Sequence, residues 1–303
     1  MVTRVALRLL PPAAWILALT VTAAAQGSPD AAVQALLDAD RAGSAAAANR
    51  TLVDGLTAMF AADVIVPGPP GRLYRGLDEV AAFLRSSPDA DGRARWAPVG
   101  AGLSADGRHG FTYGFMTVTR PDGTESPLKY MAYWVRHDAG WRVAGYKRAR
   151  RPAGTADTTM KAPHLPARLV APTTDPAVLE RQRASLVAAE RAFSDEAQRV
   201  GLGPAFAAFG LPTAVNMGGA ANASYVVGAG AIGRLIGEGA PQPTSPVEWS
   251  TEVALVASSG DLGISFGFIR PNTDASGTAA RGTPFFTIWA RPSPGGPWRY
   301  IAE

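Results

Sequence analysis

The sequence contains no cysteine and few histidines. The lack of cysteine excludes disulfide bonds, a thiolate nucleophile and a lipid-modified cysteine. The three histidines are His109, His137 and His164, and none has a second potential ligand at a spacing typical of a metal site. We therefore expect neither a bound metal nor a cofactor.

Charge of one sign is also scarce. The formal net charge is +4, and lysines and arginines do not cluster into a predicted basic face. Nucleic acid is therefore not an expected partner. One short basic run, "YKRARR" at 146–151, is interpreted as a solvated strand end, with an anion-binding rim or a contact to the second half of the chain as alternatives. A hydrophobic content of 47% indicates a globular chain.

Residues 1–25 have the pattern of a signal peptide. Two early arginines precede a short apolar run, and three alanines fit a cleavage site after Ala25. Two adjacent prolines keep the apolar run shorter than the roughly 20 residues that a membrane-spanning helix needs. We expect the mature protein to begin at Gln26, to keep no stable membrane anchor, and to be periplasmic or secreted.

The rest of the chain divides into two similar halves. Residues 153–175 are rich in proline, threonine and alanine, without a helical or strand period, and are predicted to be a linker. It separates a first domain, 26–152, from a second, 176–303. Both halves carry the same aromatic frame, in which a tryptophan lies seventeen residues before "YGF" or "FGF" and another follows it. The members are Trp96, "YGF" at 113–115 and Trp134 in the first half, and Trp249, "FGF" at 266–268 and Trp289 in the second.

The order of patterns predicts an α+β fold in each half. Helical stretches containing Asp40 and Glu190 come first, followed by a short strand, a turn, a short helix and four longer strands. In the first half the long strands are expected near 94–104, 109–120, 126–137 and 140–149. Helices packed on a curved antiparallel sheet would leave a conical cavity between the two layers.

This order resembles that of the nuclear-transport-factor-2-like superfamily, in its SnoaL-like and ketosteroid-isomerase-like branch. The segments "MFAADVIV", "RGLDEVAAFL" and the closing "GWRV" carry the resemblance, and the second half is a more degenerate copy. The resemblance implies two tandem cone-shaped domains that pack on each other through their sheets. It does not imply one activity, since the superfamily includes enzymes, binding modules and assembly domains.

The isomerase residues of the family do not carry over. The position of the base matches Gly68 in the first half and Met217 in the second, and neither has an aspartate or glutamate within two residues. The supporting tyrosines match Phe60 and Leu84, and the protonated acid falls near Ala132. The isomerase reaction is therefore not expected.

Binding of a small apolar molecule in the first-domain cavity is the expected function, with a structural second domain. The aromatic residues of the two "YGF" and "FGF" segments are predicted to point into the cavities. The candidate ligand-binding residues are Phe60, Tyr74, Leu84, Tyr113, Phe115, Tyr130, Trp134, Asn216, Phe266 and Phe268. One alternative is a cyclase, hydratase or isomerase with Asp63 or Tyr113 as acid or base. Another is a non-catalytic interaction module with a filled cavity.

Overall fold

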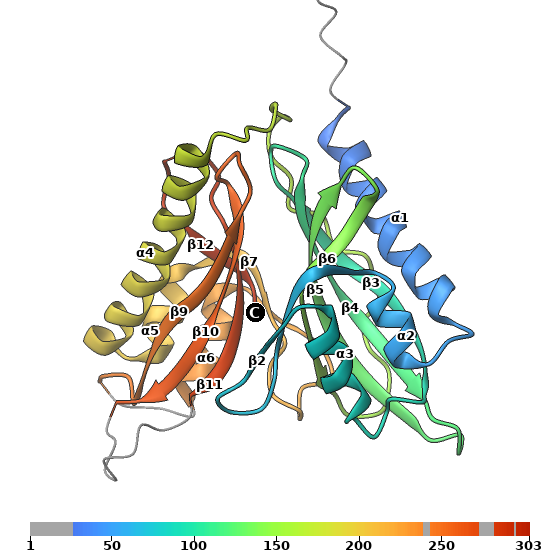
Figure 1. Ribbon diagram of the computed structural model, residues 1–303. Coiled ribbons are helices and arrows are strands. Elements are labelled where there is room, and N and C mark those ends of the chain that lie inside the picture. Colours follow the sequence, from blue (N-terminus) through green and yellow to red (C-terminus); the bar gives the residue numbers. More distant parts are fainter. Residues whose placement is uncertain (1–26, 239–242, 273–281, 294) are drawn as a thin grey trace, which may run out of the picture.

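Two six-stranded sheets stand back to back, and helices cover the outer side of each (Figure 1). The computed structural model describes residues 27–238, 243–272, 282–293 and 295–303. The signal peptide expected over residues 1–25 lies outside the described residues. Among the described helices, none is long and apolar enough to cross a membrane.

The first domain follows the predicted order of helices and strands. Its elements are α1 (Pro29–Ala47), α2 (Leu52–Thr57), β1 (Phe60–Pro67), β2 (Leu73–Arg75), α3 (Leu77–Arg85), β3 (Arg93–Leu103), β4 (His109–Thr119), β5 (Glu125–His137) and β6 (Gly140–Arg150). The sheet order is β2-β1-β6-β5-β4-β3, and β1 pairs with β6 in parallel. The sheet is therefore mixed, whereas the sequence analysis predicted an antiparallel one.

The second domain repeats this arrangement. Its elements are α4 (Pro176–Val200), α5 (Leu202–Phe209), β7 (Gly210–Asn216), β8 (Val226–Val227), α6 (Ala229–Glu238), β9 (Val247–Val256), β10 (Leu262–Pro271), β11 (Thr283–Ala290) and β12 (Arg299–Ala302). Its strand order, β8-β7-β12-β11-β10-β9, matches that of the first sheet strand for strand. The duplicated aromatic frame is thus a duplicated α+β domain.

Both long helices begin in the same way. Ser28 accepts a hydrogen bond from the backbone N–H of Ala31 at 3.2 Å, and Asp175 accepts one from Ala177 at 2.8 Å. A proline follows each capping residue, at a helical position where its missing N–H leaves no hydrogen bond unmade. The caps fix where α1 and α4 start, and so which of their residues face the sheets.

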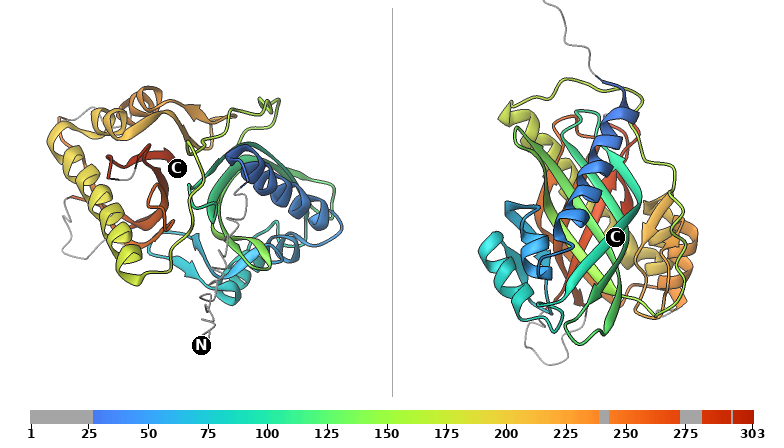
Figure 2. Two further views of the ribbon diagram at one scale, coloured as in Figure 1. Left: turned by 90° about the horizontal axis from the view of Figure 1, so that it is seen from above. Right: turned by 90° about the vertical axis from the view of Figure 1, so that its right-hand side faces the viewer.

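Besides the apolar core inside each domain, a further apolar core lies between the two sheets. It joins residues of β4 and β5 to residues of β10 and β11, including Phe111, Tyr113, Phe115, Met131, Tyr133, Ile264, Phe266, Phe286 and Ile288. Figure 2 shows, from above, the two curved sheets facing each other with α1 and α4 on opposite outer sides. The first domain thus contacts the second through the sheet faces that its own helices leave uncovered.

This core corrects the predicted direction of the frame aromatics. Tyr113, Phe115 and Phe266 belong to the cluster between the sheets and not to the helix-covered sides. Their neighbour Thr112 points the other way and hydrogen-bonds the indole of Trp134 inside the first domain. Strand β4 is buried on both faces, so its alternation separated the two faces correctly but did not tell which of them lies under the helices.

Polar contacts also join the domains. The Lys129 ammonium on β5 is fully buried and donates to the backbone oxygens of Met217 and Asn222 of the second domain, at 2.7 Å in the case of Asn222. Between β3 and β4, Asp106 of the first domain accepts a hydrogen bond from the Ser258 hydroxyl of the second domain at 2.8 Å. These contacts fix the two sheets in one relative position.

The segment between the domains lies partly along the edge strand β3. Lys161 donates its backbone N–H to Val99 at 2.8 Å, and His164 donates to Ala101 at 2.9 Å. The segment therefore covers backbone groups of a strand edge that would otherwise face solvent.

Candidate functional site

Each domain holds a buried carboxylate at the centre of its aromatic frame. Asp40 of α1 accepts hydrogen bonds from the indole N–H of Trp96 at 2.6 Å and from the hydroxyl of Tyr130 at 2.8 Å. Glu190 of α4 accepts from the indoles of Trp249 at 2.8 Å and Trp289 at 3.0 Å. Burial raises the pKa of Asp40 and of Glu190, while these hydrogen bonds act in the opposite direction.

A serine one helical turn later completes the same contact in both domains. Ser44 accepts the backbone N–H of Trp96 at 2.9 Å, and Ser194 accepts that of Trp249 at 3.0 Å. The acid and the serine are four residues apart, which places both on one face of the helix. The sequence analysis aligned the acids but assigned them no role. Their common spacing to a serine was the signal that could have revealed it.

Ser265 belongs to this network. Its hydroxyl lies on β10 and donates to Glu190 inside the second domain. It also lies 3.0 Å from the indole nitrogen of Trp289. This serine therefore serves to hold the Glu190 carboxylate.

Two of the differences between the two interiors concern tyrosines of the first domain. Four residues before the second frame tryptophan, the first domain has Tyr130 and the second has Phe285. Five residues after Trp141 and Trp298, the first domain has Tyr146 and the second has Glu303. Tyr130 and Tyr146 are both buried in the first-domain core. The second domain therefore lacks a phenol hydroxyl at one position and has a carboxyl group in place of a phenol at the other.

A cavity of about 180 Å³ lies at this place in the second domain. Its wall is almost wholly apolar, and its polar side chains are those of Glu190, Thr287 and Glu303. The remaining lining residues are Phe193, Leu202, Phe206, Ile236, Val247, Trp249, Ile269 and Phe285. They come from all three helices of the domain and from β9, β10 and β11, so the cavity lies between the helices and the concave face of the sheet.

Glu303 is the most unusual group of this cavity. Asn216 donates its amide N–H to the Glu303 carboxylate at 2.9 Å. Burial raises the pKa of Glu303 to about 7, with a smaller contribution in the same direction from Glu190 and opposition from the Lys147 cation of the first domain. Near neutral pH the carboxyl group can therefore both donate and accept a proton.

The structure spreads the predicted site residues over several environments. Tyr130 and Trp134 pack inside the first domain together with Leu84 and Phe60, whose ring lies 5.4 Å from that of Tyr146. Tyr74 stacks on Phe83 with ring centroids 4.1 Å apart. These residues share one core, but they fill it instead of enclosing the apolar cavity described above.

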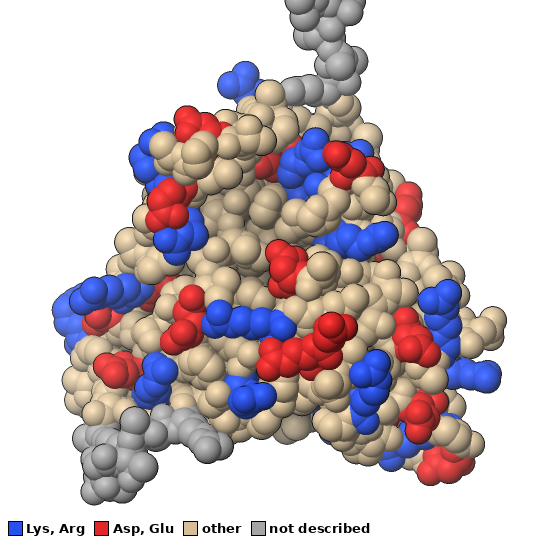
Figure 3. Space-filling view, viewed as in Figure 1, with Lys and Arg blue, Asp and Glu red and all other residues tan. Residues whose placement is uncertain are grey.

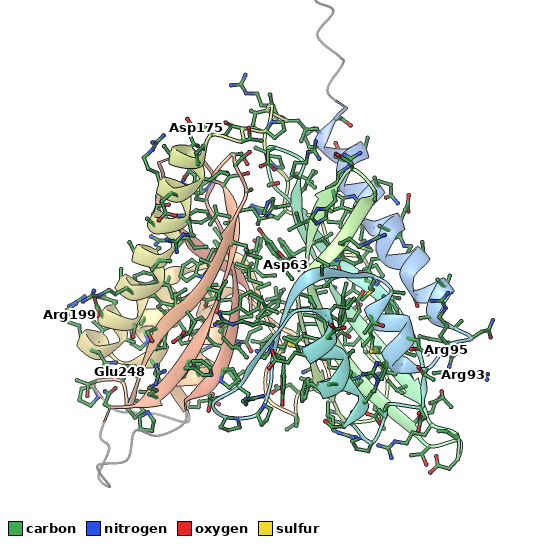
Figure 4. All side chains as sticks on the ribbon, viewed as in Figure 1. Asp63, Arg93, Arg95, Asp175, Arg199 and Glu248 are labelled. Atoms are coloured by element: carbon green, nitrogen blue, oxygen red, sulfur yellow. The ribbon has the colours of Figure 1, made fainter. Side chains whose placement is uncertain are left out.

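The other predicted residues lie elsewhere. Phe268 is partly buried beneath the guanidinium of Arg270, 5.5 Å from its ring centroid. Asn216 does not line the second-domain cavity, but it donates a hydrogen bond to the carboxylate of Glu303, which does. Asp63, labelled in Figure 4, is exposed on β1, where it is not one of the residues that line the cavity.

The face of the molecule in Figure 3 carries charges of both signs, without a patch of one sign. On the face in Figure 3, lysines and arginines alternate with aspartates and glutamates. Within the ranges that the structure describes, no group of three or more histidine, aspartate or glutamate residues could hold a metal ion.

The helices, the mixed sheet and the internal cavity define a cone-shaped α+β domain. Residues 42–144 match the family model described as a SnoaL-like domain. The first domain is thus a SnoaL-like domain, and the second domain repeats its strand order.

Solved structures of several descriptions are similar to one domain at a time. An NTF2-like protein with a cystatin-like fold from Novosphingobium aromaticivorans is 14% identical, with 41% of this chain and 84% of that chain covered and a TM-score of 0.32. A putative aromatic ring hydroxylase from the same species is 16% identical, with 43% and 97% covered and a TM-score of 0.34. A putative calcium/calmodulin-dependent protein kinase II association domain from Xanthomonas campestris is 13% identical, with 40% and 87% covered and a TM-score of 0.31.

No curated protein matches the chain. At the identities of the solved structures, no activity follows for this protein from any of them.

Proposed function

We propose that the second domain binds a small, neutral, largely apolar molecule in its cavity, with Glu303 as the polar contact. The observation that carries this proposal is the carboxyl group of Glu303 in the wall of an otherwise apolar cavity, where burial raises its pKa to about 7. An apolar pocket with a few convergent polar groups is the usual form of a small-molecule site.

The cavity volume limits the size of the ligand. An engineered cavity of about 150 Å³ in another protein holds one benzene molecule. The 180 Å³ here would therefore accept a single six-membered ring with one or two small substituents, or a short chain. Larger polycyclic molecules would need the helices to move away from the sheet.

The charges of the cavity limit the chemistry of the ligand. Glu190 and Glu303 would repel an anion. A charged amine would find few hydrogen-bond acceptors elsewhere in the wall, because the other lining residues are almost all apolar. A neutral molecule with a hydroxyl or carbonyl group fits best. Protonated Glu303 can donate a hydrogen bond to it, and the ionised form can accept one.

Ligand occupancy can be tested by mass spectrometry of organic extracts from the purified protein, with phenol and cyclohexanone as added probes. Val247→Trp places an indole in the cavity wall. Val227→Trp is the matched control, because Val227 is 55% exposed on β8. We expect small molecules to be retained by the wild type and by Val227→Trp, and lost from Val247→Trp.

Circular dichroism first establishes that both variants are folded. Equal retention by all three proteins, or retention by none of them at millimolar probe concentration, would contradict the proposal.

Acid–base catalysis is the second candidate function, favoured by the same Glu303. A carboxylate with a pKa near the working pH can take a proton from the carbon beside a bound carbonyl, leaving an enolate, and can return a proton to that carbon. In heavy water this exchange would place deuterium next to the carbonyl of cyclohexanone. Exchange that Glu303→Gln abolishes would favour an enzyme, while binding without exchange would favour a carrier.

We also propose that the protein acts outside the cytoplasm. The support is the sequence of residues 1–25, with its early arginines, apolar run and alanines. N-terminal sequencing of the protein from a cell fraction outside the cytoplasm tests this, with Gln26 as the expected first residue.

A further inference from the structure

A second pocket lies in the first domain, between the end of α3 and the ends of β1 and β6. Its volume is about 290 Å³. The lining residues are Val66, Pro67, Phe83, Leu84, Ser86, Ser87, Tyr146, Lys147 and Arg148. The pocket therefore has apolar residues on one side and the Arg148 guanidinium with two serines on the other, while the Lys147 side chain points to the opposite face of β6, towards Glu303.

Arg148 has an incomplete set of hydrogen bonds. Its Nη1 is buried and has no hydrogen-bond partner among the described residues. Its Nη2 has one long contact, 3.4 Å to the hydroxyl of Ser87. A guanidinium group carries five N–H donors, and a buried donor without an acceptor is unfavourable.

The nearby carboxylate is already in use. Asp89 lies two residues from Ser87, but it accepts from Arg120 at 2.8 Å and from Ser126 at 3.1 Å. Arg150 approaches it as well, at 3.8 Å. Among the described residues, no ion pair includes Arg148, so none of their carboxylates neutralises its charge.

The opposite side of the pocket is hydrocarbon. Phe83 is held against Tyr74 by a stacked contact, with an angle of 14° between the rings. Leu84 and Tyr146 are almost fully buried. A ligand in this pocket would therefore meet aromatic and aliphatic carbon at one end and a guanidinium group at the other.

We propose that this pocket binds a small amphipathic carboxylate, such as a short fatty acid or an aromatic acid. The carboxylate would accept hydrogen bonds from Arg148, with the hydroxyls of Ser86 and Ser87 beside it, and the hydrocarbon part would lie on Phe83 and Leu84. Arginine suits this role because its planar donors match the two oxygens of a carboxylate.

This site is separate from the proposed second-domain site and takes a ligand of different charge. The second-domain cavity carries Glu190 and Glu303 and disfavours anions, whereas the first-domain pocket carries Arg148 and favours them. An anion-binding rim, one of the alternatives for the basic run at 146–151, is thus part of this proposal.

Isothermal titration of the full-length protein with hexanoate and benzoate tests the inference. Hexanamide and benzamide serve as neutral matches, and inorganic phosphate as an anion without hydrocarbon. Arg148→Gln removes the charge, and Arg150→Gln is the control, because Arg150 is exposed two residues further along the same strand. Arg148→Lys keeps a cation there if Arg148→Gln does not fold.

We expect the carboxylates to bind wild type, Arg150→Gln and the cavity-blocked Val247→Trp alike. In Arg148→Gln, affinity should fall by about ten-fold or more, the effect of losing a charge-assisted hydrogen bond. Arg148→Lys should bind more weakly than wild type, since lysine lacks the planar pair of donors.

Several results would overturn the inference. They are no carboxylate binding to the wild type, amides that bind as tightly as the acids, or phosphate that binds as tightly as hexanoate. Equal losses in Arg148→Gln and Arg150→Gln would also overturn it. Loss in Val247→Trp alone would instead assign the binding to the second domain.

Discussion

Replacing Glu303 by glutamine should make the protein more stable at neutral pH and leave its stability at acidic pH nearly unchanged. The folded state raises the pKa of Glu303 from 4.5 to about 7, mainly through burial. At about 1.4 kcal/mol per pKa unit, ionising this carboxyl in the folded protein costs up to about 3 kcal/mol. Glutamine keeps an oxygen that can accept the N–H of Asn216 but cannot ionise.

The direction in which the unfolding free energy changes with pH follows from proton linkage. The folded state holds the Glu303 proton more tightly than the unfolded state does. Its contribution to stability is therefore complete below pH 4.5, falls as the pH rises towards about 7, and is constant above that. The difference in unfolding free energy between Glu303→Gln and wild type should grow from near zero at about pH 4 to about 3 kcal/mol at about pH 8.

Urea unfolding followed by tryptophan fluorescence measures this difference across the pH range. Glu248→Gln is the control, because Glu248 is exposed on β9 at the edge of the same domain (Figure 4). Its difference from wild type should not depend on pH in this way. A pH-independent difference for Glu303→Gln, or a variant that is less stable than wild type at pH 8, would refute the assignment of a raised pKa to this residue.

Three further predictions concern the frame and the domain contact. Asp40→Ala leaves two buried donors, on Trp96 and Tyr130, without an acceptor and should destabilise the protein by about 4 kcal/mol in thermal melts. Asp38→Ala is the control, because Asp38 is exposed on the same helix, and it should cost less than about 0.5 kcal/mol. Lys129→Met removes the donor to three backbone oxygens of the second domain and should speed amide hydrogen exchange over residues 217–225, and unchanged exchange would contradict this. Gly145→Val places a Cβ atom 2.7 Å from Cζ of Phe266, with two methyl groups beyond it, and should separate the domains, seen as faster proteolysis between them.

Much of the fold could be predicted from the sequence. The strand expected near 109–120 is β4 over His109–Thr119, because its alternation and the turn signals around it are local features. The parallel pairing of β1 with β6 could not be predicted in the same way, since it depends on contacts between the two ends of the domain.

The site was harder to predict than the fold. The presence of apolar residues on both faces of β4 concealed which face meets the other domain, so Tyr113 was assigned to the wrong side. The many glycines and alanines of the second half suggested a degenerate, structural domain. It nevertheless encloses a cavity with Glu303 in its wall, where the first domain has Tyr146, and the sequence alone does not show what surrounds that position in space.

The account rests most directly on the second-domain cavity being open to a small neutral molecule. Diffraction from crystals soaked in 4-bromophenol, recorded at the bromine absorption edge, tests this. We predict an anomalous peak among Leu202, Phe206 and Ile269, with the phenol hydroxyl directed to Glu303, and no such peak in Val247→Trp. A wild-type cavity without bromine, in crystals where the compound binds elsewhere on the protein, would contradict the central claim.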